Sequence, residues 1–478
     1  MSESKYIPTI GIECHVQLKT KTKLFSGADN DARDAAPNTM VSPICFGLPG
    51  TLPVLNREAV QLAIRAGLAL EAEIAERSYF ERKHYFYPDL PKGYQITQLA
   101  HPTIGAGSVT IHLDDGSQKT VRIHHAHIEE DAGKLTHPSG ADYSLVDLNR
   151  ASTPLIEIVS EPDMHSAAEA KAYAQELYLL MTYADVTYGD LYHGNMRFDV
   201  NVSVAPEGEP LGTRTETKNL NSFKAVERAV EFEVKRQTAL LEKGERVVQE
   251  TRGWNEDRQA TFSQRSKEDA HDYRYFPDAD IPPVVITSRE VDIARADMPK
   301  LPSAYRQDFA KLGLDSSVVS ALLGVKRHAD LVTEAYAQAG QGAATRIAHW
   351  LSSALGSADE SVDTVKLDTG RLVDLANMVE SAELSSTAAK EVLLAMVASE
   401  VAPRDIAEQK NLLQMSDESA IALIVDQVLD DPANASAVQD IKSGNEKVIG
   451  FLVGQIMKVS KGKANPGLAQ KLIRERIL

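Results

Sequence analysis

The sequence predicts an α+β fold: an antiparallel-sheet domain over residues 1–295, an all-helical domain over 296–405 and a small helical tail domain over 406–478. Short alternating runs, turns and most aromatic residues lie before about residue 290, whereas Ala, Leu, Glu and Lys dominate after about residue 300. A chain of 478 residues is also too long for a single core. These observations together indicate several domains, with strands in the first.

Two stretches predict strands with one apolar and one polar face. In "IGIECHVQLKT", residues 10–20, the apolar side chains are Ile10, Ile12, Cys14, Val16 and Leu18, and the polar ones are Glu13, His15, Gln17 and Lys19. "NMRFDVNVSV" alternates in the same way, and "VTIHLDDGSQKTVRIHHAHIEE" reads as two strands joined by a tight turn. Because successive side chains of a strand point to opposite faces, one face of this sheet is expected to be polar.

Helices are predicted where apolar residues recur at helical spacing. "SAAEAKAYAQELYLLMTY" begins with the capping pair Ser166 and Glu169, and "SFKAVERAVEFEVKRQ" follows further along the first domain. In the tail, Asn465 is expected to cap a last helix that starts with Pro466.

Composition, charge and the N-terminal residues argue against a membrane-spanning, an exported and a nucleic-acid-coating protein. Apolar residues make up 43% and charged residues 25% of the chain, as in folded globular proteins, and no apolar run reaches the length of a bilayer span. No export signal is recognisable at "MSESKYIPTIGIE", so we expect a cytoplasmic location. The net charge of −17 argues against a protein that coats nucleic acid, although it leaves room for local basic patches.

Carboxylates on the predicted polar face suit a hard divalent cation such as Mg²⁺ that bridges phosphate oxygens. The candidate ligands are Glu13, His15, Glu129 or Glu130, Asp199 and Glu216. Strand alternation alone does not choose between Glu129 and Glu130. A solvated outer face is the alternative explanation, because antiparallel sheets often expose one side to water. The string "HHAH" places His125 and His127 on one strand face, but without a recognisable set of zinc ligands.

Two clusters combine basic and aromatic residues, "RKHYFYPDLPKGYQITQ" and "QRSKEDAHDYRYFPDADIPP". Lysine and arginine contact phosphates, and tyrosine stacks on bases, so these clusters favour nucleotide or nucleic-acid contacts. Rigid packing loops are the alternative. A third basic element, "KVSKGKANPGL", carries Lys458, Lys461 and Lys463; it suits a polynucleotide backbone, or is an ordinary solvated lysine cluster.

Eight strings in order along the chain resemble the B subunits of the tRNA-dependent amidotransferases that convert Glu-tRNA(Gln) or Asp-tRNA(Asn) to the amide. They are "IGIECHVQLKT", "HYFYPDLPKGYQITQ", "HIEEDAGK", "LVDLNRASTPLIEIVSEPD", "GNMRFDVNVSV", "KNLNSF", "HDYRYFPDADIPP" and "GFLVGQIMKVSKGKANPGL". They span nearly the whole sequence, so the resemblance is specific.

The resemblance implies a cradle-like first domain that uses ATP and Mg²⁺, with Mn²⁺ as an alternative, to phosphorylate the tRNA-borne carboxylate. Ammonia would come from glutamine hydrolysed in the partner A subunit, while a small C subunit would brace the pair. The resemblance also implies metal-site and catalytic roles for Glu13, His15, Glu130, Asp199 and Glu216, and it favours Glu130 over Glu129. The competing hypothesis is a non-catalytic tRNA-binding scaffold.

Further roles are expected at lower specificity. Contacts to ATP or the tRNA acceptor end are expected from Lys83, Tyr87, Arg265 and Arg274, and contacts to the tRNA body from Lys458, Lys461 and Lys463. One departure concerns the loop "FSGADNDARDAAPNTMVSPICFGLPG", where many relatives carry paired cysteines that bind structural zinc. This chain keeps only Cys45 there, so we expect no structural zinc.

Overall fold

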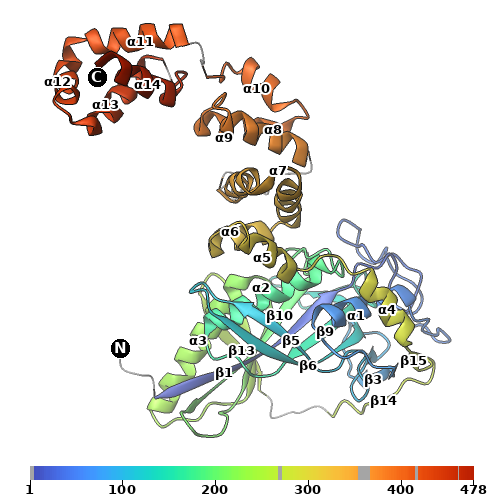
Figure 1. The fold of residues 1–478 in the computed structure, drawn as a ribbon. Coiled ribbons are helices and arrows are strands. Elements are labelled where there is room, and N and C mark those ends of the chain that lie inside the picture. The colour runs from blue at the N-terminus through green and yellow to red at the C-terminus, as the bar shows by residue number, and fades with distance from the viewer. Residues whose placement is uncertain (1–4, 267–271, 354–365, 415–417, 461, 478) are drawn as a thin grey trace. The chain divides into compact units, whose positions relative to one another are not determined.

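The computed structural model describes residues 5–266, 272–353, 366–414, 418–460 and 462–477, and all structural statements below concern these residues. The chain divides into two compact units, Met1–Pro302 and Ser303–Leu478 (Figure 1). The first unit therefore extends slightly beyond the predicted boundary at residue 295.

An eight-stranded sheet forms the centre of the first unit. Its strand order is β13-β12-β11-β10-β1-β9-β6-β5, and every neighbouring pair is antiparallel except β11 and β12, which are parallel. The strands are β1 (Tyr6–Gln17), β5 (Gly107–His112), β6 (Gln118–Glu130), β9 (Pro154–Ser160), β10 (Met196–Pro206), β11 (Thr215–Leu220), β12 (Glu250–Asn255) and β13 (Ala260–Ser266). The first strand of the chain thus lies near the middle of the sheet, between β9 and β10.

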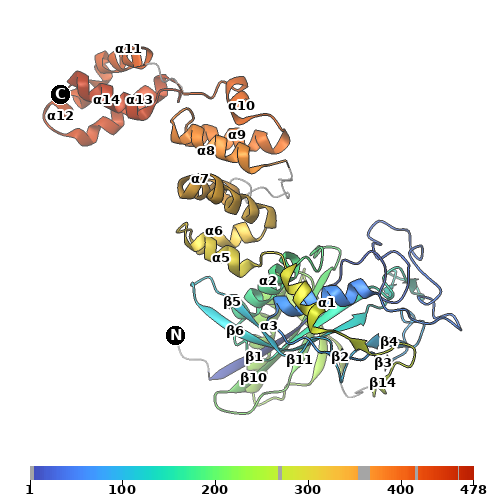
Figure 2. The same cartoon turned by 45° about the vertical axis from the view of Figure 1, so that its right-hand side comes forward.

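Three helices cover the apolar face of this sheet: α1 (Arg57–Ala69), α2 (Ala167–Tyr183) and α3 (Phe223–Glu242) (Figures 1 and 2). Asn56, Ser166 and Ser222 cap them by accepting backbone N–H groups of the first turn. The predicted core face of β1 is confirmed, because Ile10, Ile12, Cys14, Val16 and Leu18 are each at most 1% exposed. The predicted hairpin of β5 and β6 is confirmed as well.

Short strands build the remainder of the first unit. The order β14-β3-β4 makes a three-stranded sheet from Phe276–Pro277, Glu81–His84 and Tyr94–Thr97. Two further pairs join β2 (Arg77–Ser78) to β15 (Val284–Val285) and β7 (Lys134–Thr136) to β8 (Leu145–Asp147), and helix α4 (Ser288–Ala296) follows. Strand β14 pairs with β3, so this small sheet brings together the two predicted basic and aromatic clusters.

The described residues of the second unit form helices and no strands, as predicted. Its helices are α5 (Pro302–Ala310), α6 (Ser316–Leu323), α7 (Lys326–Ser353), α8 (Thr369–Glu380), α9 (Ser386–Ala398), α10 (Pro403–Gln409), α11 (Glu418–Asp430), α12 (Ala435–Lys442), α13 (Ile449–Val459) and α14 (Pro466–Ile477), with short 3₁₀ turns at Pro432–Asn434 and Glu446–Val448. Helices α11–α14 share a hydrophobic core of their own. Asn465 caps α14 as predicted, accepting the Gly467 N–H at 2.9 Å. Among the described helices, none has the length and apolar character needed to cross a membrane.

Candidate functional site

The face of the large sheet opposite the three helices carries two groups of side chains with cation-binding atoms. Both groups lie on the central strands, because the register pairs Glu13 of β1 with Asp199 of β10, and His15 of β1 with Glu157 of β9. The alternation that buries Cys14 between Glu13 and His15 therefore turns both polar residues toward this face.

The first group, called here the acidic group, consists of Glu13, Asp199 and Glu216. One carboxylate oxygen from each lies within 4.8 Å of the others. Each also accepts a neutral hydrogen bond: Glu13 Oε1 from Asn201 Nδ2 at 3.0 Å, Asp199 Oδ1 from the Asn219 N–H at 2.8 Å and Glu216 Oε2 from Thr251 Oγ1 at 3.2 Å. The acidic group is therefore held in place by uncharged donors.

Lys218 supplies the positive charge that the acidic group needs. Its Nζ lies 2.7 Å from Asp199 Oδ2 and 2.8 Å from Glu216 Oε1. Burial alone would raise the pKa of Asp199, but the charges of Lys218 and His15 hold it below the ordinary value.

The negative charge of Glu13 is less well compensated by neighbouring positive charges. Burial, together with the carboxylates of Glu157 and Glu216, raises the pKa of Glu13. An added cation would therefore relieve repulsion in the acidic group.

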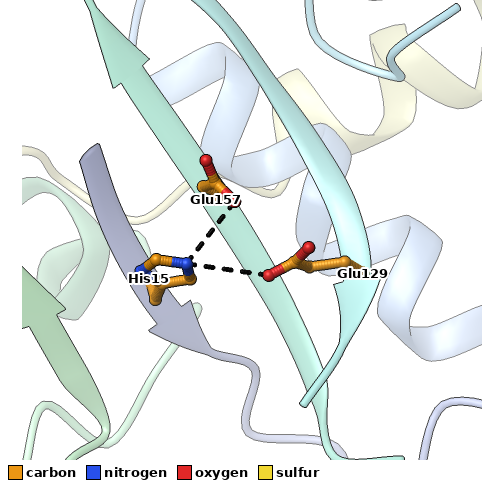
Figure 3. A group of neighbouring side chains, drawn as sticks. All are labelled: His15, Glu129 and Glu157. Atoms are coloured by element: carbon orange, nitrogen blue, oxygen red, sulfur yellow. Dashed lines mark ion pairs between the residues drawn. The ribbon is translucent and has the colours of Figure 1, made fainter. Parts of the chain in front are cut away.

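The second group, called here the histidine group, consists of His15, Glu129 and Glu157, with three candidate ligand atoms within 4.8 Å of one another. His15 Nε2 lies 3.4 Å from Glu157 Oε2 and 3.7 Å from Glu129 Oε1, and the three side chains converge from β1, β6 and β9 (Figure 3). His127 adds a second imidazole, whose Nε2 lies 3.6 Å from each carboxylate.

The histidines of this face differ in charge. Burial disfavours a charged imidazole, but the hydrogen bond and the negative charge of Glu157 raise the pKa of His15 to about 9. The pKa of His127 is also raised against the effect of burial, chiefly by Glu157. Burial and the neighbouring His127 lower the pKa of His125 to about 4. His125 and His127 do share one strand face as predicted, with 3.2 Å between ring nitrogens, but His127 belongs to a cluster with carboxylates.

Glu130, which the family resemblance favoured, lies apart from both groups, and the structure places Glu129 beside His15 instead. Its side chain is 1% exposed and forms a buried ion pair with Lys92. It also accepts the Ile96 N–H at 2.9 Å and the Ser152 hydroxyl at 2.6 Å. Adjacent residues of a strand point to opposite faces, so Glu129 is the one that meets His15.

A cavity of about 470 Å³ unites the two basic and aromatic clusters and is lined by Lys83, His84, Tyr85, Phe86, Tyr87, Asp272, Tyr273 and Arg274. Lys83 Nζ lies 5.0 Å from the centroid of the Tyr273 ring, and the Arg274 guanidinium lies 6.0 Å from that of Phe86. Burial opposes the charge of Lys83, but Glu129 and Tyr275 raise its pKa, so this cavity is electrostatically connected to the histidine group. The structure thus brings together three predicted contact residues, Lys83, Tyr87 and Arg274.

The other predicted contact residues lie elsewhere. Arg265 is on the edge strand β13, opposite Thr251 of β12. Lys458 lies in α13 and Lys463 in the connection from α13 to α14, whereas Lys461 falls outside the described residues. Cys45 is buried, with Lys23 Nζ 3.6 Å from its sulfur. The absence of structural zinc from its loop stays a prediction.

Sequence reasoning missed Glu157 and Lys218 as members of these groups and left Glu129 as the less favoured alternative. Glu157 had a readable signal: it is the only charged residue in the otherwise apolar run "PLIEIV". Lys218 had none, since a lysine on a strand is ordinary.

The donor set fits a hard divalent cation. Carboxylate oxygens dominate both groups, and oxygen is the ligand that Mg²⁺ and Mn²⁺ favour. One more observation supports the fit: within the described part of the chain, the buried amide oxygen of Asn201, next to Glu13, has no hydrogen-bond donor. A buried polar oxygen without a donor is costly unless a ligand satisfies it.

Comparison with known proteins identifies the family to which the chain belongs. A family model described as the GatB/GatE catalytic domain matches residues 8–292, and one described as the GatB domain matches residues 330–477. The chain is 48% identical over 476 residues to the B subunit of the aspartyl/glutamyl-tRNA(Asn/Gln) amidotransferase of Alcanivorax borkumensis, covering 98% of each protein. It is 46% identical to the protein of the same name from Halorhodospira halophila over 479 residues, covering 99% of each. The chain therefore belongs to the GatB/GatE family, together with the aspartyl/glutamyl-tRNA(Asn/Gln) amidotransferase B subunits.

Proposed function

We propose that this chain phosphorylates the side-chain carboxylate of Glu-tRNA(Gln), Asp-tRNA(Asn) or both at the expense of ATP, as the B subunit of an amidotransferase that also contains A and C subunits. The observation that carries the proposal is the pair of ligand groups on one sheet face, in a chain of this family. A cytoplasmic location belongs to the same proposal.

The reaction explains why such a site is needed. A carboxylate does not exchange its oxygen for ammonia directly, because oxide is a very poor leaving group. When a carboxylate oxygen attacks the γ-phosphorus of ATP, ADP leaves and an acyl phosphate forms; ammonia then attacks the acyl carbon and inorganic phosphate leaves. Phosphoryl transfer depends mainly on positioning and on stabilising charge at the phosphate oxygens.

The side chains of the polar face have distinct parts in this scheme. The acidic group and the histidine group would hold Mg²⁺ or Mn²⁺, which when bound neutralises charge on the phosphates. Lys83 adds positive charge near the histidine group, Arg274 adds a second positive charge to the cavity that both residues line, and Tyr87 offers an exposed ring there for stacking. We assign these three residues, and with less structural support Arg265, to ATP or the acceptor end of the tRNA.

The helical regions serve the tRNA body in this proposal. The predicted division into a cradle domain (1–295), a helical domain (296–405) and a tail domain (406–478) assigns catalysis to the first and tRNA contacts to the others. Lys458, Lys461 and Lys463 would contact phosphates of the tRNA backbone.

The test uses the chain assembled with its A and C subunits, offered Glu-tRNA(Gln) or Asp-tRNA(Asn) with ATP and free ammonium, so that glutamine hydrolysis is bypassed. ADP formation should require the aminoacylated tRNA and a divalent cation. Glu13→Gln should abolish ADP formation while tRNA affinity stays within about twofold. Glu209→Gln, which removes one exposed carboxylate from the turn after β10, is the matched control and should behave as wild type. If Glu13→Gln keeps full activity, the non-catalytic scaffold is the better explanation.

A further inference from the structure

A positively charged side chain of the protein already contacts the acidic group. Lys218 Nζ contacts Asp199 Oδ2 and Glu216 Oε1, at 2.7 Å and 2.8 Å. The other oxygen of each of these carboxylates accepts a neutral donor, the Asn219 N–H or the Thr251 hydroxyl. Lys218 therefore occupies the two oxygens that a metal ion could otherwise take without displacing a neutral donor.

The backbone around Asp199 fixes this arrangement. The pairing of β10 with β11 shifts register between Phe198 and Val200, so Asp199 has no direct partner on β11. Asn219 adopts a left-handed conformation with φ of 59° and donates its N–H to Asp199. Asparagine tolerates this conformation better than most residues. The carboxylates are thus held by the strands themselves.

Lys218 is more exposed than the two carboxylates that it contacts. Its side chain is 36% exposed, compared with 4% for Asp199 and 12% for Glu216. A lysine has a long flexible side chain with a single compact charge, so its ammonium can leave while its backbone stays in the strand. The carboxylates cannot withdraw in the same way.

A second approach to the acidic group lies on the side of Glu13. A cavity of about 230 Å³ is lined in part by Glu13, Asn201 and Arg214, but not by Lys218. The amide oxygen of Asn201 without a donor lies at this end of the group. A ligand in this cavity can therefore reach Glu13 while Lys218 still contacts Asp199 and Glu216.

We propose that Lys218 is an exchangeable counter-cation of the acidic group, which a divalent metal ion displaces and which the phosphates of the nucleotide then receive. This inference rests on the proposed function, since it takes the acidic group to be part of the metal and nucleotide site. Metal alone must expel the ammonium with no new anion to receive it, so it binds weakly. When metal and nucleotide bind together, the negatively charged phosphates receive the displaced ammonium, so this cost is avoided. Through Lys218, bound nucleotide raises the affinity for the metal ion, and bound metal ion raises the affinity for the nucleotide by the same factor.

The experiment measures Mn²⁺ affinity of the assembled enzyme by electron paramagnetic resonance of free Mn²⁺, with and without a non-hydrolysable ATP analogue. Lys218→Met should bind Mn²⁺ at least about tenfold more tightly than wild type without nucleotide, since one positive charge in contact with the ligands is gone. The gain in Mn²⁺ affinity caused by the analogue should shrink by a similar factor. Lys218→Arg, which keeps the charge, should stay near wild type.

Lys119→Met is the matched control, because it removes one lysine charge from the same sheet, where Lys119 pairs with Glu169 at 2.8 Å. It should leave both Mn²⁺ affinities unchanged. If Lys218→Met folds poorly, the rise in melting temperature on adding Mn²⁺ gives the same comparison, and it should exceed that of wild type.

The outcomes separate the two proposals. Equal or weaker Mn²⁺ affinity in Lys218→Met overturns the counter-cation role, even if the assembled enzyme still phosphorylates Glu-tRNA. If Glu13→Gln leaves Mn²⁺ affinity unchanged in both the wild-type and the Lys218→Met background, the acidic group is not a metal site. That result overturns this inference together with the assignment on which it rests.

Discussion

Two adjacent glutamates at the end of β6 provide the sharpest test of the site. Glu129→Gln and Glu130→Gln make the same chemical change at neighbouring positions, yet the structure assigns them different consequences. Glu129 faces His15 on the polar sheet face, whereas Glu130 lies in a buried ion pair with Lys92.

For Glu130→Gln the expected effect is on stability. Glu130 is 1% exposed and the side chain of Lys92 is 9% exposed, so the variant leaves an ammonium buried without its counter-charge. Removing one partner of a buried ion pair typically costs about 3–5 kcal/mol. The amide oxygen of glutamine can take the place of Oε1, which accepts from Lys92 and the Ile96 N–H, but its NH₂ then meets the Ser152 hydroxyl, which donates to Oε2 in the wild type. We therefore expect the free energy of unfolding to fall by about 3 kcal/mol or more.

For Glu129→Gln the expected effect is on activity. Its carboxylate accepts one hydrogen bond, from the Thr97 hydroxyl at 3.2 Å, while His15 and His127 lie beyond hydrogen-bond distance at 3.7 Å and 3.6 Å. Losing one ordinary hydrogen bond costs about 1 kcal/mol, and Glu157 still supplies a negative charge next to His15 and His127. Metal-dependent phosphorylation, in contrast, should be lost.

Urea unfolding of each purified variant gives the stability, and ADP formation by the assembled amidotransferase gives the activity. The reasoning is refuted if Glu130→Gln is as stable as wild type but inactive while Glu129→Gln remains active. Glu130 would then be the carboxylate that acts in the reaction, as the family resemblance implied.

Three further predictions follow from single contacts. Glu157→Gln should weaken Mn²⁺ binding by about tenfold or more, measured by calorimetry, because it removes the charge nearest His15. Arg274→Ala should raise the KM for ATP or for aminoacyl-tRNA with little change in melting temperature, since Arg274 lines the cavity on an exposed loop; an unchanged KM for both would remove it from the site. Glu233 has its pKa lowered from 4.5, against burial, by Arg236 and Thr261, so its stabilisation is present above pH 4.5 and lost as pH falls through the lower folded value. Urea unfolding measured at a series of acidic pH values below 4.5 should therefore show that the free energy of unfolding falls less with decreasing pH in Glu233→Gln than in wild type.

Much of the fold was readable from the sequence because its signals are local. The alternation around Cys14 and the turn "DDGS" give strands and a hairpin, and Ser166 and Asn465 mark helix starts. The strand order is not local: β1 pairs with β9 and β10, from far later in the chain. Nothing in the separate segments specifies which strands become neighbours.

The site was predictable only in part for the same reason. Glu13, Asp199 and Glu216 do meet, but the expected single site is two groups, because His15 joins Glu157 on β9 while Glu13 joins Asp199 on β10. The choice between Glu129 and Glu130 depends on which face of β6 is buried at its end, and alternation within one strand does not reveal that. Lys83 and Arg274 were singled out because both clusters are rich in aromatic residues as well as charge, and the two residues do line one cavity.

The central place of β1 has a consequence for how the protein is made. Tyr6 pairs with Pro206, so β1 has no neighbour on that side until about 200 further residues have been synthesised. At about 5–20 residues per second, that delay is roughly 10–40 s. During this time β1 keeps an unpaired backbone edge beside its apolar face, which makes the nascent chain prone to aggregation. Nascent chains should therefore depend on chaperones, and fragments that end before β10 should have no acidic group at all, however complete their hairpins are.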